Sequence, residues 1–197
     1  MLKGPLPGEK AQKLMAPDYR GEGDSSRRST EAAVLALMYP LEELTGLVFM
    51  KRNTYDGPHS AQVSFPGGAR EQEDQNLAQT ALRECREELG IKESIEILGS
   101  LSPLHIPVSA FMVSPFVAYS AKRPVFNPDP TEVEYLIETS IEALLNPVNQ
   151  DREKWMLNDR KVDVPLYRVG GDIIWGATAM ILAEFLQLAS GLPALQH

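Results

Sequence analysis

The stretch "GGAREQEDQNLAQTALRECREELGI", residues 67–91, opens with two glycines and contains six acidic side chains. Between residues 75 and 89 its apolar side chains recur every three or four positions, and this period predicts a helix with one buried face. Gly90 stands where a glycine commonly ends a helix. Cys85 falls on the apolar face, so we expect it to be a core residue rather than a nucleophile.

Three acidic residues of this helix, Glu84, Glu87 and Glu88, are neighbours on its surface because residues three and four positions apart share a face. Carboxylates so close together repel one another at neutral pH unless a cation lies among them. Oxygen ligands suit Mg²⁺ or Mn²⁺, which also bind substrate phosphates. The alternative is an exposed helix face stabilised by pairs such as Arg83 with Glu87, and spacing alone leaves both interpretations open.

The composition of the 197 residues, 43% hydrophobic and 23% charged, is typical of one soluble globular domain. A net charge of −8 argues against nucleic-acid binding, which depends on clustered Lys and Arg. The longest apolar run, residues 32–39, is too short to span a bilayer, and the N-terminus has no signal-peptide core, so no membrane attachment is expected. A single cysteine favours a reducing compartment, and we expect a cytoplasmic location.

Residues 1–30 are polar and rich in glycine and serine, which predicts a loosely ordered arm, with a short helix around residues 9–15. One domain, residues 31–197, follows. Its apolar runs predict strands near 32–39, 46–52, 61–65, 95–101, 111–119, 153–157 and 161–169, a strand–helix unit at 132–147, and a closing helix at 175–190. The Pro-Gly-Gly run at 66–68 is expected to break the strand that precedes it. These elements interleave without regular alternation, so the expected fold is α+β, with a mixed sheet between helices.

The opening stretch resembles the Nudix box, which runs Gly, five residues, Glu, seven residues, Arg-Glu, an apolar residue, any residue, Glu-Glu, any residue, Gly and an apolar residue. Residues 83–91, "RECREELGI", match its second half at every position. In the first half Asp74 stands in place of Glu, and eight residues rather than seven separate it from Arg83. The resemblance implies a Nudix-type α/β/α sandwich that hydrolyses a nucleoside diphosphate linked to another moiety.

The same resemblance implies roles for individual residues. Glu84, Glu87, Glu88 and the Gly68 carbonyl would hold Mg²⁺ or Mn²⁺, and Arg83 would orient Glu84 through charge-assisted hydrogen bonds.

Asp74 would cap or brace the start of the helix. Many Nudix enzymes recruit a glutamate from a late loop as a further ligand or as the base, and Glu132 and Glu134 are the candidates here. Glu84 is the other candidate for the general base.

The sequence before the box, "FMKRNTYDGPHSAQVSFPGG" (49–68), resembles the extension found in coenzyme A pyrophosphatases, which also carry the longer box. This implies that coenzyme A (CoA) or acyl-CoA is cleaved to 3′,5′-ADP and (acyl-)4′-phosphopantetheine. Arg52, His59 and Phe65 are the candidate substrate contacts. Each also has an alternative explanation: a surface salt bridge for Arg52, a surface histidine for His59, and packing of the turn for Phe65.

Gly57 and Ala61 depart from the CoA pattern, so substrate identity is less firmly implied than reaction type. The alternatives are hydrolysis of ADP-ribose or a dinucleotide, and a catalytically inactive module that senses a nucleotide. An inactive module predicts a damaged box, yet the Arg and all three Glu residues are present. The implied partner is a nucleotide-containing small molecule, and a homodimer is suggested by resemblance only.

Overall fold

The computed structural model describes residues 5–20, 29–54 and 61–191. Its main sheet has eight strands: β1 (Thr30–Leu41), β2 (Leu44–Arg52), β3 (Val63–Ser64), β4 (Gly67–Ala69), β5 (Glu96–Ser100), β6 (Leu104–Ile106), β7 (Phe111–Tyr119) and β8 (Val133–Ser140). The central strands β1 and β7 run parallel, whereas the other pairs are antiparallel, so the sheet is mixed as predicted.

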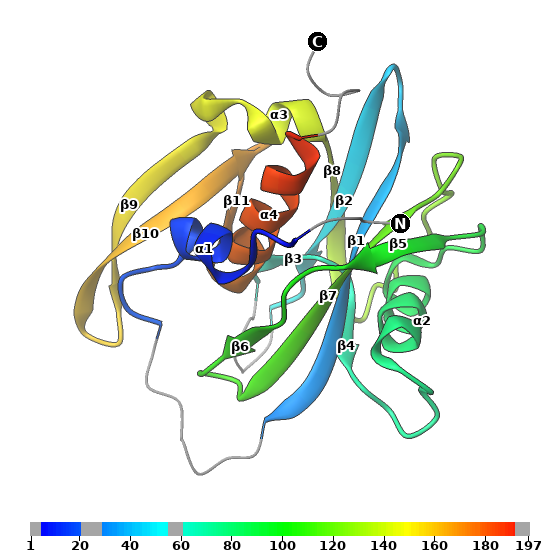
Figure 1. Cartoon of the computed structure of the whole chain (residues 1–197), viewed down its shortest axis with the longest axis horizontal. Coiled ribbons are helices and arrows are strands. Elements are labelled where there is room, and N and C mark those ends of the chain that lie inside the picture. The colour runs from blue at the N-terminus through cyan, green and yellow to red at the C-terminus, as the bar shows by residue number, and fades with distance from the viewer. Residues whose placement is uncertain (1–4, 21–28, 55–60, 192–197) are drawn as a thin grey trace.

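A second sheet has three antiparallel strands, β9 (Gln150–Leu157), β10 (Arg160–Val169) and β11 (Asp172–Trp175). The helices are α1 (Gly8–Gln12), α2 (Leu77–Leu89), α3 (Ile141–Leu145) and α4 (Gly176–Ala189), with short 3₁₀ turns η1 (Lys13–Met15) and η2 (Pro147–Asn149). In Figure 1, α2 lies on one side of the main sheet, while α4, α1 and the second sheet lie on the other. The expected α/β/α sandwich is confirmed.

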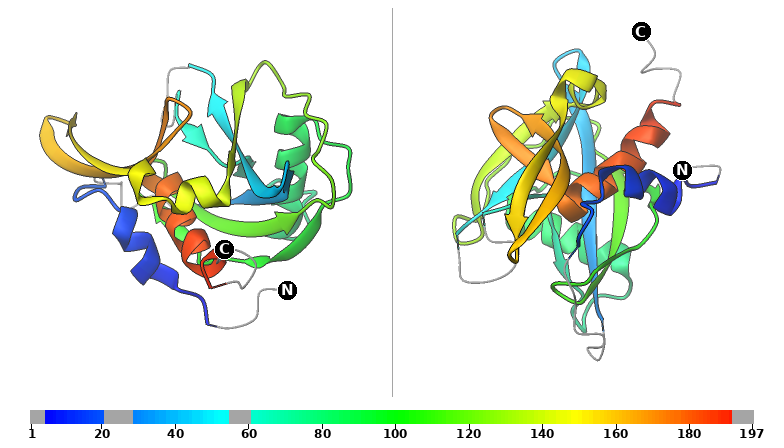
Figure 2. Two further views of the ribbon diagram at one scale, coloured as in Figure 1. Left: turned by 90° about the horizontal axis from the view of Figure 1, so that it is seen from above. Right: turned by 90° about the vertical axis from the view of Figure 1, so that its left-hand side faces the viewer.

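The core divides into two clusters, one on each face of the main sheet. On the α2 side, Cys85 and Leu89 pack with Leu35 and Leu37 of β1. On the other side, the apolar residues of α4 pack against Phe49 and the second sheet. Figure 2 shows these layers from two further directions. Cys85 is fully buried, which confirms that it is a core residue, and burial raises the pKa of its thiol to about 12.

Most predicted elements are present with boundaries shifted by a few residues, but three short strands differ from expectation. Strands β6 and β11, of three and four residues, were not predicted. The Gly-Gly pair expected to break a strand instead opens β4, which pairs with β1. This pairing holds the Gly-rich segment beside α2, where the acidic residues lie.

The N-terminal residues 8–15 form the expected short helix, which packs against α4 rather than remaining loose. The carboxylate of Glu184 on α4 is fully buried and accepts hydrogen bonds from the Gly8 amide (3.1 Å) and the Gln12 side chain (2.9 Å). It also accepts from the amide and hydroxyl of Ser102. Over residues 5–20, the segment expected to be a loosely ordered arm is therefore docked on the domain. In the described parts of the chain, no helix is long and apolar enough to cross a bilayer.

Candidate active site

Helix α2 starts and ends at residues that satisfy its backbone. Asn76 is the N-cap, and its side chain accepts a hydrogen bond from the Gln79 amide at 3.0 Å. Gly90 ends the helix at φ 65°, and a side chain there would collide with the Asn127 carbonyl oxygen. The resemblance implied that Asp74 would cap or brace the start of the helix. The structure gives the capping role to Asn76, so the capping alternative for Asp74 is wrong. Asn76 carries a recognisable signal, because an Asn before an apolar run is a common helix start.

Asp74 braces Arg83 instead. It is 6% exposed and accepts hydrogen bonds from Arg83 Nε (3.1 Å) and Nη2 (3.0 Å) and from the Glu71 amide (3.0 Å). These hydrogen bonds, with those from Arg83 foremost, hold the pKa of Asp74 well below its usual range. Although eight residues rather than seven separate Asp74 from Arg83, the two side chains are in contact.

Three consecutive residues of β4 each meet a residue of α2. The Ala69 carbonyl accepts from Arg83 Nη2 at 3.1 Å, and the Gly67 amide donates to Glu88 Oε2 at 2.7 Å. Between them, a Cβ atom added to Gly68 would stand 2.5 Å from the Glu84 carboxyl carbon. Only a glycine leaves room for the Glu84 carboxylate at this position.

The three glutamates of the box have different surroundings. Glu84 is half-buried and accepts from Arg83 Nη1 at 3.0 Å, and burial is the main cause that raises its pKa. Glu88 is 2% exposed and accepts from Arg52 Nη2 at 3.2 Å; burial raises its pKa to about 8 against the lowering effect of Arg52. The Glu87 side chain is 60% exposed, and its one described ion pair is with Arg83.

Oxygen donors from Glu84, Glu88 and the Gly68 carbonyl are the type that Mg²⁺ and Mn²⁺ prefer, so this donor set fits such an ion. Among the described residues, however, no three His, Cys, Asp or Glu side chains lie close enough together to hold one. Two arginines contact these carboxylates: Arg83 pairs with Glu84 at 3.0 Å, and Arg52 pairs with Glu88 at 3.2 Å.

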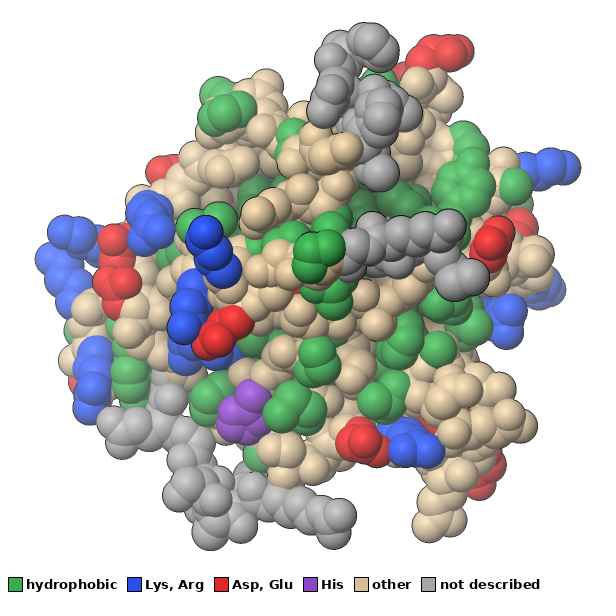
Figure 3. All heavy atoms as spheres, in the orientation of Figure 1, with side chains coloured by type: hydrophobic (Ala, Val, Ile, Leu, Met, Phe, Trp, Pro, Cys, Tyr) green, Lys and Arg blue, Asp and Glu red, His purple; other side chains and the backbone are tan. Residues whose placement is uncertain are grey.

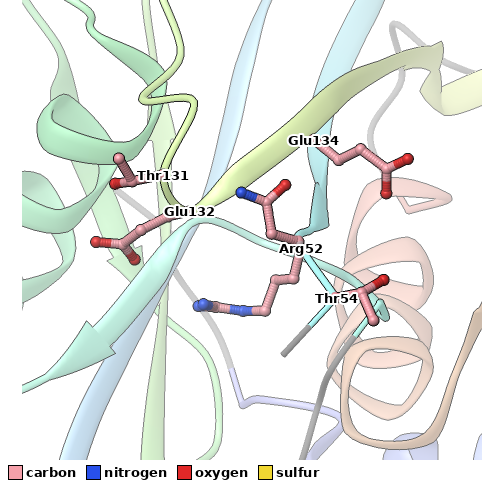
Figure 4. A pocket seen from close by; sticks show the side chains of 6 residues that line it. Arg52, Thr54, Thr131, Glu132 and Glu134 are labelled. Carbon is pink, nitrogen blue, oxygen red and sulfur yellow. The ribbon is translucent and has the colours of Figure 1, made fainter. Parts of the chain in front are cut away.

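An open polar cavity of about 610 Å³ adjoins the box and is lined by Arg52, Asn53, Thr54, Thr131, Glu132 and Glu134. Figure 4 shows the Glu132 carboxylate at the left of the view, toward which the Arg52 guanidinium extends, whereas the Glu134 carboxylate lies at the right. The charge of Glu132 also acts on both Glu84 and Glu88. Of the two late glutamates, the structure brings only Glu132 toward the box.

The candidate substrate contacts lie in three different settings. Arg52 ends β2 and donates to Glu88 and to the Gly67 carbonyl (3.0 Å), so its guanidinium is engaged by the box itself. Phe65 is 2% exposed and packs on Phe49 with a ring-centre distance of 4.7 Å. Phe65 is also one of the residues that line a second cavity. His59 lies outside the described residues.

The comparisons with known proteins agree with the geometry. Residues 30–159 match the family model described as the NUDIX domain. The chain is 34% identical to the Nudix hydrolase NudL of Pectobacterium atrosepticum, itself uncharacterized, over 75% of this chain and 77% of that protein. It is 31% identical to the human mitochondrial coenzyme A diphosphatase NUDT8, over 84% of this chain and 73% of that protein.

Among solved structures, the fold is similar to that of the Nudix hydrolase RenU of M. smegmatis, with a TM-score of 0.59 and 15% sequence identity. The match covers 87% of this chain and 92% of RenU. Nudix hydrolases generally need divalent metal ions and bind nucleotide-containing small molecules. The chain belongs to the Nudix hydrolase family and is a pyrophosphatase that acts on nucleoside diphosphate substrates.

Proposed function

We propose that this enzyme hydrolyses the diphosphate of coenzyme A or acyl-CoA, giving 3′,5′-ADP and (acyl-)4′-phosphopantetheine. The observation that supports this substrate is the 31% identity with a named CoA diphosphatase, together with the resemblance of residues 49–68 to CoA pyrophosphatases. Cleavage adds one water molecule across the P–O–P bridge. The water oxygen forms a new bond to one phosphorus, the bond from that phosphorus to the bridging oxygen breaks, and two monophosphates leave.

In this proposal Glu84, Glu87, Glu88 and the Gly68 carbonyl would hold Mg²⁺ or Mn²⁺. A bound divalent ion stabilises charge on the diphosphate oxygens and lowers the pKa of the attacking water. Arg83 fixes the Glu84 carboxylate, and the Asp74 carboxylate in turn fixes Arg83.

Glu132 is the general base of the proposed mechanism. It lines the open cavity, on the side toward which Arg52 points, and none of the described guanidinium groups pairs with it as Arg83 pairs with Glu84. It accepts the proton of the attacking water. Glu134 lines the same cavity but lies at the other end of it in Figure 4, away from the Arg52 guanidinium, so Glu134→Gln serves as the matched control for Glu132→Gln. The assignment requires Glu132→Gln to lower kcat strongly while Glu134→Gln leaves kcat near the wild-type value.

A substrate panel with Mg²⁺ tests the proposed substrate. CoA and acetyl-CoA are expected to have higher kcat/KM values than ADP-ribose and NADH. If CoA is cleaved no faster than ADP-ribose or NADH, the CoA assignment is wrong. Product analysis in ¹⁸O-labelled water identifies the phosphorus that is attacked.

A second test separates the enzyme from a nucleotide-sensing module without activity. Glu84→Gln should lower kcat by about 10²–10³, as loss of a key electrostatic group commonly does. Turnover that is unchanged in this variant would contradict the proposed metal site, and no turnover in the wild type with either metal would favour the sensing module.

The proposal also covers location and assembly. A single, buried cysteine supports a reducing compartment, and we place the protein in the cytoplasm. The human relative is named a mitochondrial protein, so fractionation of the source cells is the deciding measurement. A homodimer rests on family resemblance, and light scattering would detect it.

A further inference from the structure

A groove leads away from the acidic residues on the other side of Arg52. Its inner part is a cavity of about 360 Å³ that reaches Gly67, Gly68 and Arg52. Its outer part is a cavity of about 270 Å³. The two parts share Gln62, Ile106 and Ala177 in their walls and are therefore adjacent. The groove thus begins at the reacting centre of the proposed enzyme.

The walls of this groove differ in chemistry from those of the open polar cavity. Apolar side chains such as Phe111 and Ile181 line the inner part, and Val108 and Trp175 line the outer part. Among the described residues, each part is lined by one charged side chain, an arginine, and by no carboxylate. By contrast, the described residues that line the cavity beside Glu132 and Glu134 are all polar. An apolar groove favours an uncharged ligand, because burying a charge without a partner is costly.

The N-terminal segment, residues 17–20, forms the outer wall of the groove through Pro17, Tyr19 and Arg20. Arg20 Nη2 donates to the His105 carbonyl at 2.6 Å. The guanidinium carbon of Arg160 lies over the Tyr19 ring, 4.6 Å from the centre of that ring. The buried contacts of Glu184 hold α1, just before this segment, on α4. The wall is therefore anchored at both ends. Figure 3 shows the face that carries α1 and the β9–β10 hairpin, where apolar side chains lie among charged ones.

We propose that this groove binds the pantetheine arm of the substrate and that residues 17–20 close it on the outside. The proposal rests on the proposed function, since only a CoA-type substrate carries this arm. The arm is long, uncharged and partly apolar, and it starts at the phosphate that remains after cleavage. The 3′,5′-ADP half carries the charge of two phosphate groups and would not suit walls of this composition.

Product inhibition separates the two halves of the substrate. Inhibition constants for 4′-phosphopantetheine and for 3′,5′-ADP are measured against CoA hydrolysis with Mg²⁺. Ala177→Leu narrows the groove where its two parts meet, and Tyr19→Ala opens its outer wall. Val108→Trp, at a position that is 50% exposed, narrows the outer part with little risk to folding. Val148→Trp is the matched control, because Val148 is 76% exposed on η2 and lies outside the groove.

The expected result is a rise of about tenfold in the inhibition constant of 4′-phosphopantetheine in the groove variants, as for other misfitted apolar contacts, with little change for 3′,5′-ADP. The control should leave both constants unchanged. A rise for 3′,5′-ADP instead, or no change in either constant while CoA is still cleaved, would overturn the groove assignment and leave the proposed function intact. A wild type that does not cleave CoA would instead overturn the proposed function, and this inference with it.

Discussion

Asp74 is one methylene shorter than the Glu usual in the Nudix box, and it stands one position further from Arg83, yet the two side chains still meet through two hydrogen bonds. The sequence identified both residues, because their types and spacing were visible. It could not identify Arg52 as the partner of Glu88, since this contact joins positions 36 residues apart. Pairings of that kind depend on how β2 and α2 pack against each other.

The pairing of Asp74 with Arg83 should make stability depend on acid pH. The folded-state pKa of Asp74 is lowered, so its contribution is complete above the unfolded value of about 3.9 and is lost as pH falls below that value. Asp74→Asn should therefore lower the free energy of unfolding at pH 7, and its deficit should shrink toward pH 3. Urea unfolding at pH 7, 5 and 3 measures this. Glu73→Gln, at an exposed neighbouring position, is the control, and an equal deficit at every pH would contradict the prediction.

The buried carboxylate of Glu88 should have the opposite effect in the absence of a divalent ion. Its pKa is raised to about 8, so its contribution is most favourable below the unfolded value of about 4.3 and is lost as pH rises toward 8. With EDTA present, Glu88→Gln should flatten the fall in Tm between pH 5 and 8. With Mg²⁺ it should also reduce the gain in Tm that the ion gives the wild type. A wild-type Tm that stays constant from pH 5 to 8 in EDTA would contradict the prediction that ionisation of buried Glu88 destabilises the folded state.

At the scale of elements, the long periodic segments were predictable, and the short ones were not. Helix α2 and strands β1, β2, β7 and β10 each carry a hydrophobic pattern long enough to read. Strands β6 and β11 have only three and four residues, and each is defined by its pairing with a longer strand, β6 with β7 and β11 with β10. The same holds for β4, where pairing with β1 overrides two glycines. The position of the candidate site depends on the pairing of β4 with β1, because β4 places the Gly-rich backbone against α2.

Replacing Gly68 should therefore disturb the site more than the fold. A Cβ atom at this position would stand 2.5 Å from the Glu84 carboxyl carbon, so the carboxylate must move. Gly68→Ala should reduce kcat for CoA by at least about tenfold, since misplacement of a reacting group by about 1 Å can cost ~10²-fold. The loss in Tm should be small, because the displaced group is a side chain. Gly191→Ala, where a Cβ atom makes only an ordinary contact, is the control, and full activity in Gly68→Ala would show that Glu84 tolerates displacement.

At the scale of the whole molecule, the described residues 8–15 of the N-terminal segment pack on α4. Composition suggested a loose arm, because residues 1–30 are polar and carry few apolar side chains. The docking depends on Glu184, which lies within an apolar helix and receives its hydrogen bonds from residues 82 or more positions away. No local pattern marks such a residue, since a lone charge in an apolar helix has no visible partner in the sequence.

Replacing Glu184 should release this segment from the domain. Glu184→Gln retains the shape of the side chain but substitutes an amide for a carboxylate that accepts from the Gly8 amide, the Gln12 side chain and Ser102. At least one buried donor then lacks an acceptor, which costs about 1–3 kcal/mol of unfolding free energy. Hydrogen exchange in residues 8–15 should accelerate more than in α2, because the lost contacts belong to the docked segment. Gln187→Ala, exposed on the same helix, controls for the change in α4 itself. Equal protection of residues 8–15 in Glu184→Gln and in the wild type would mean that apolar packing on α4 holds the segment without the carboxylate.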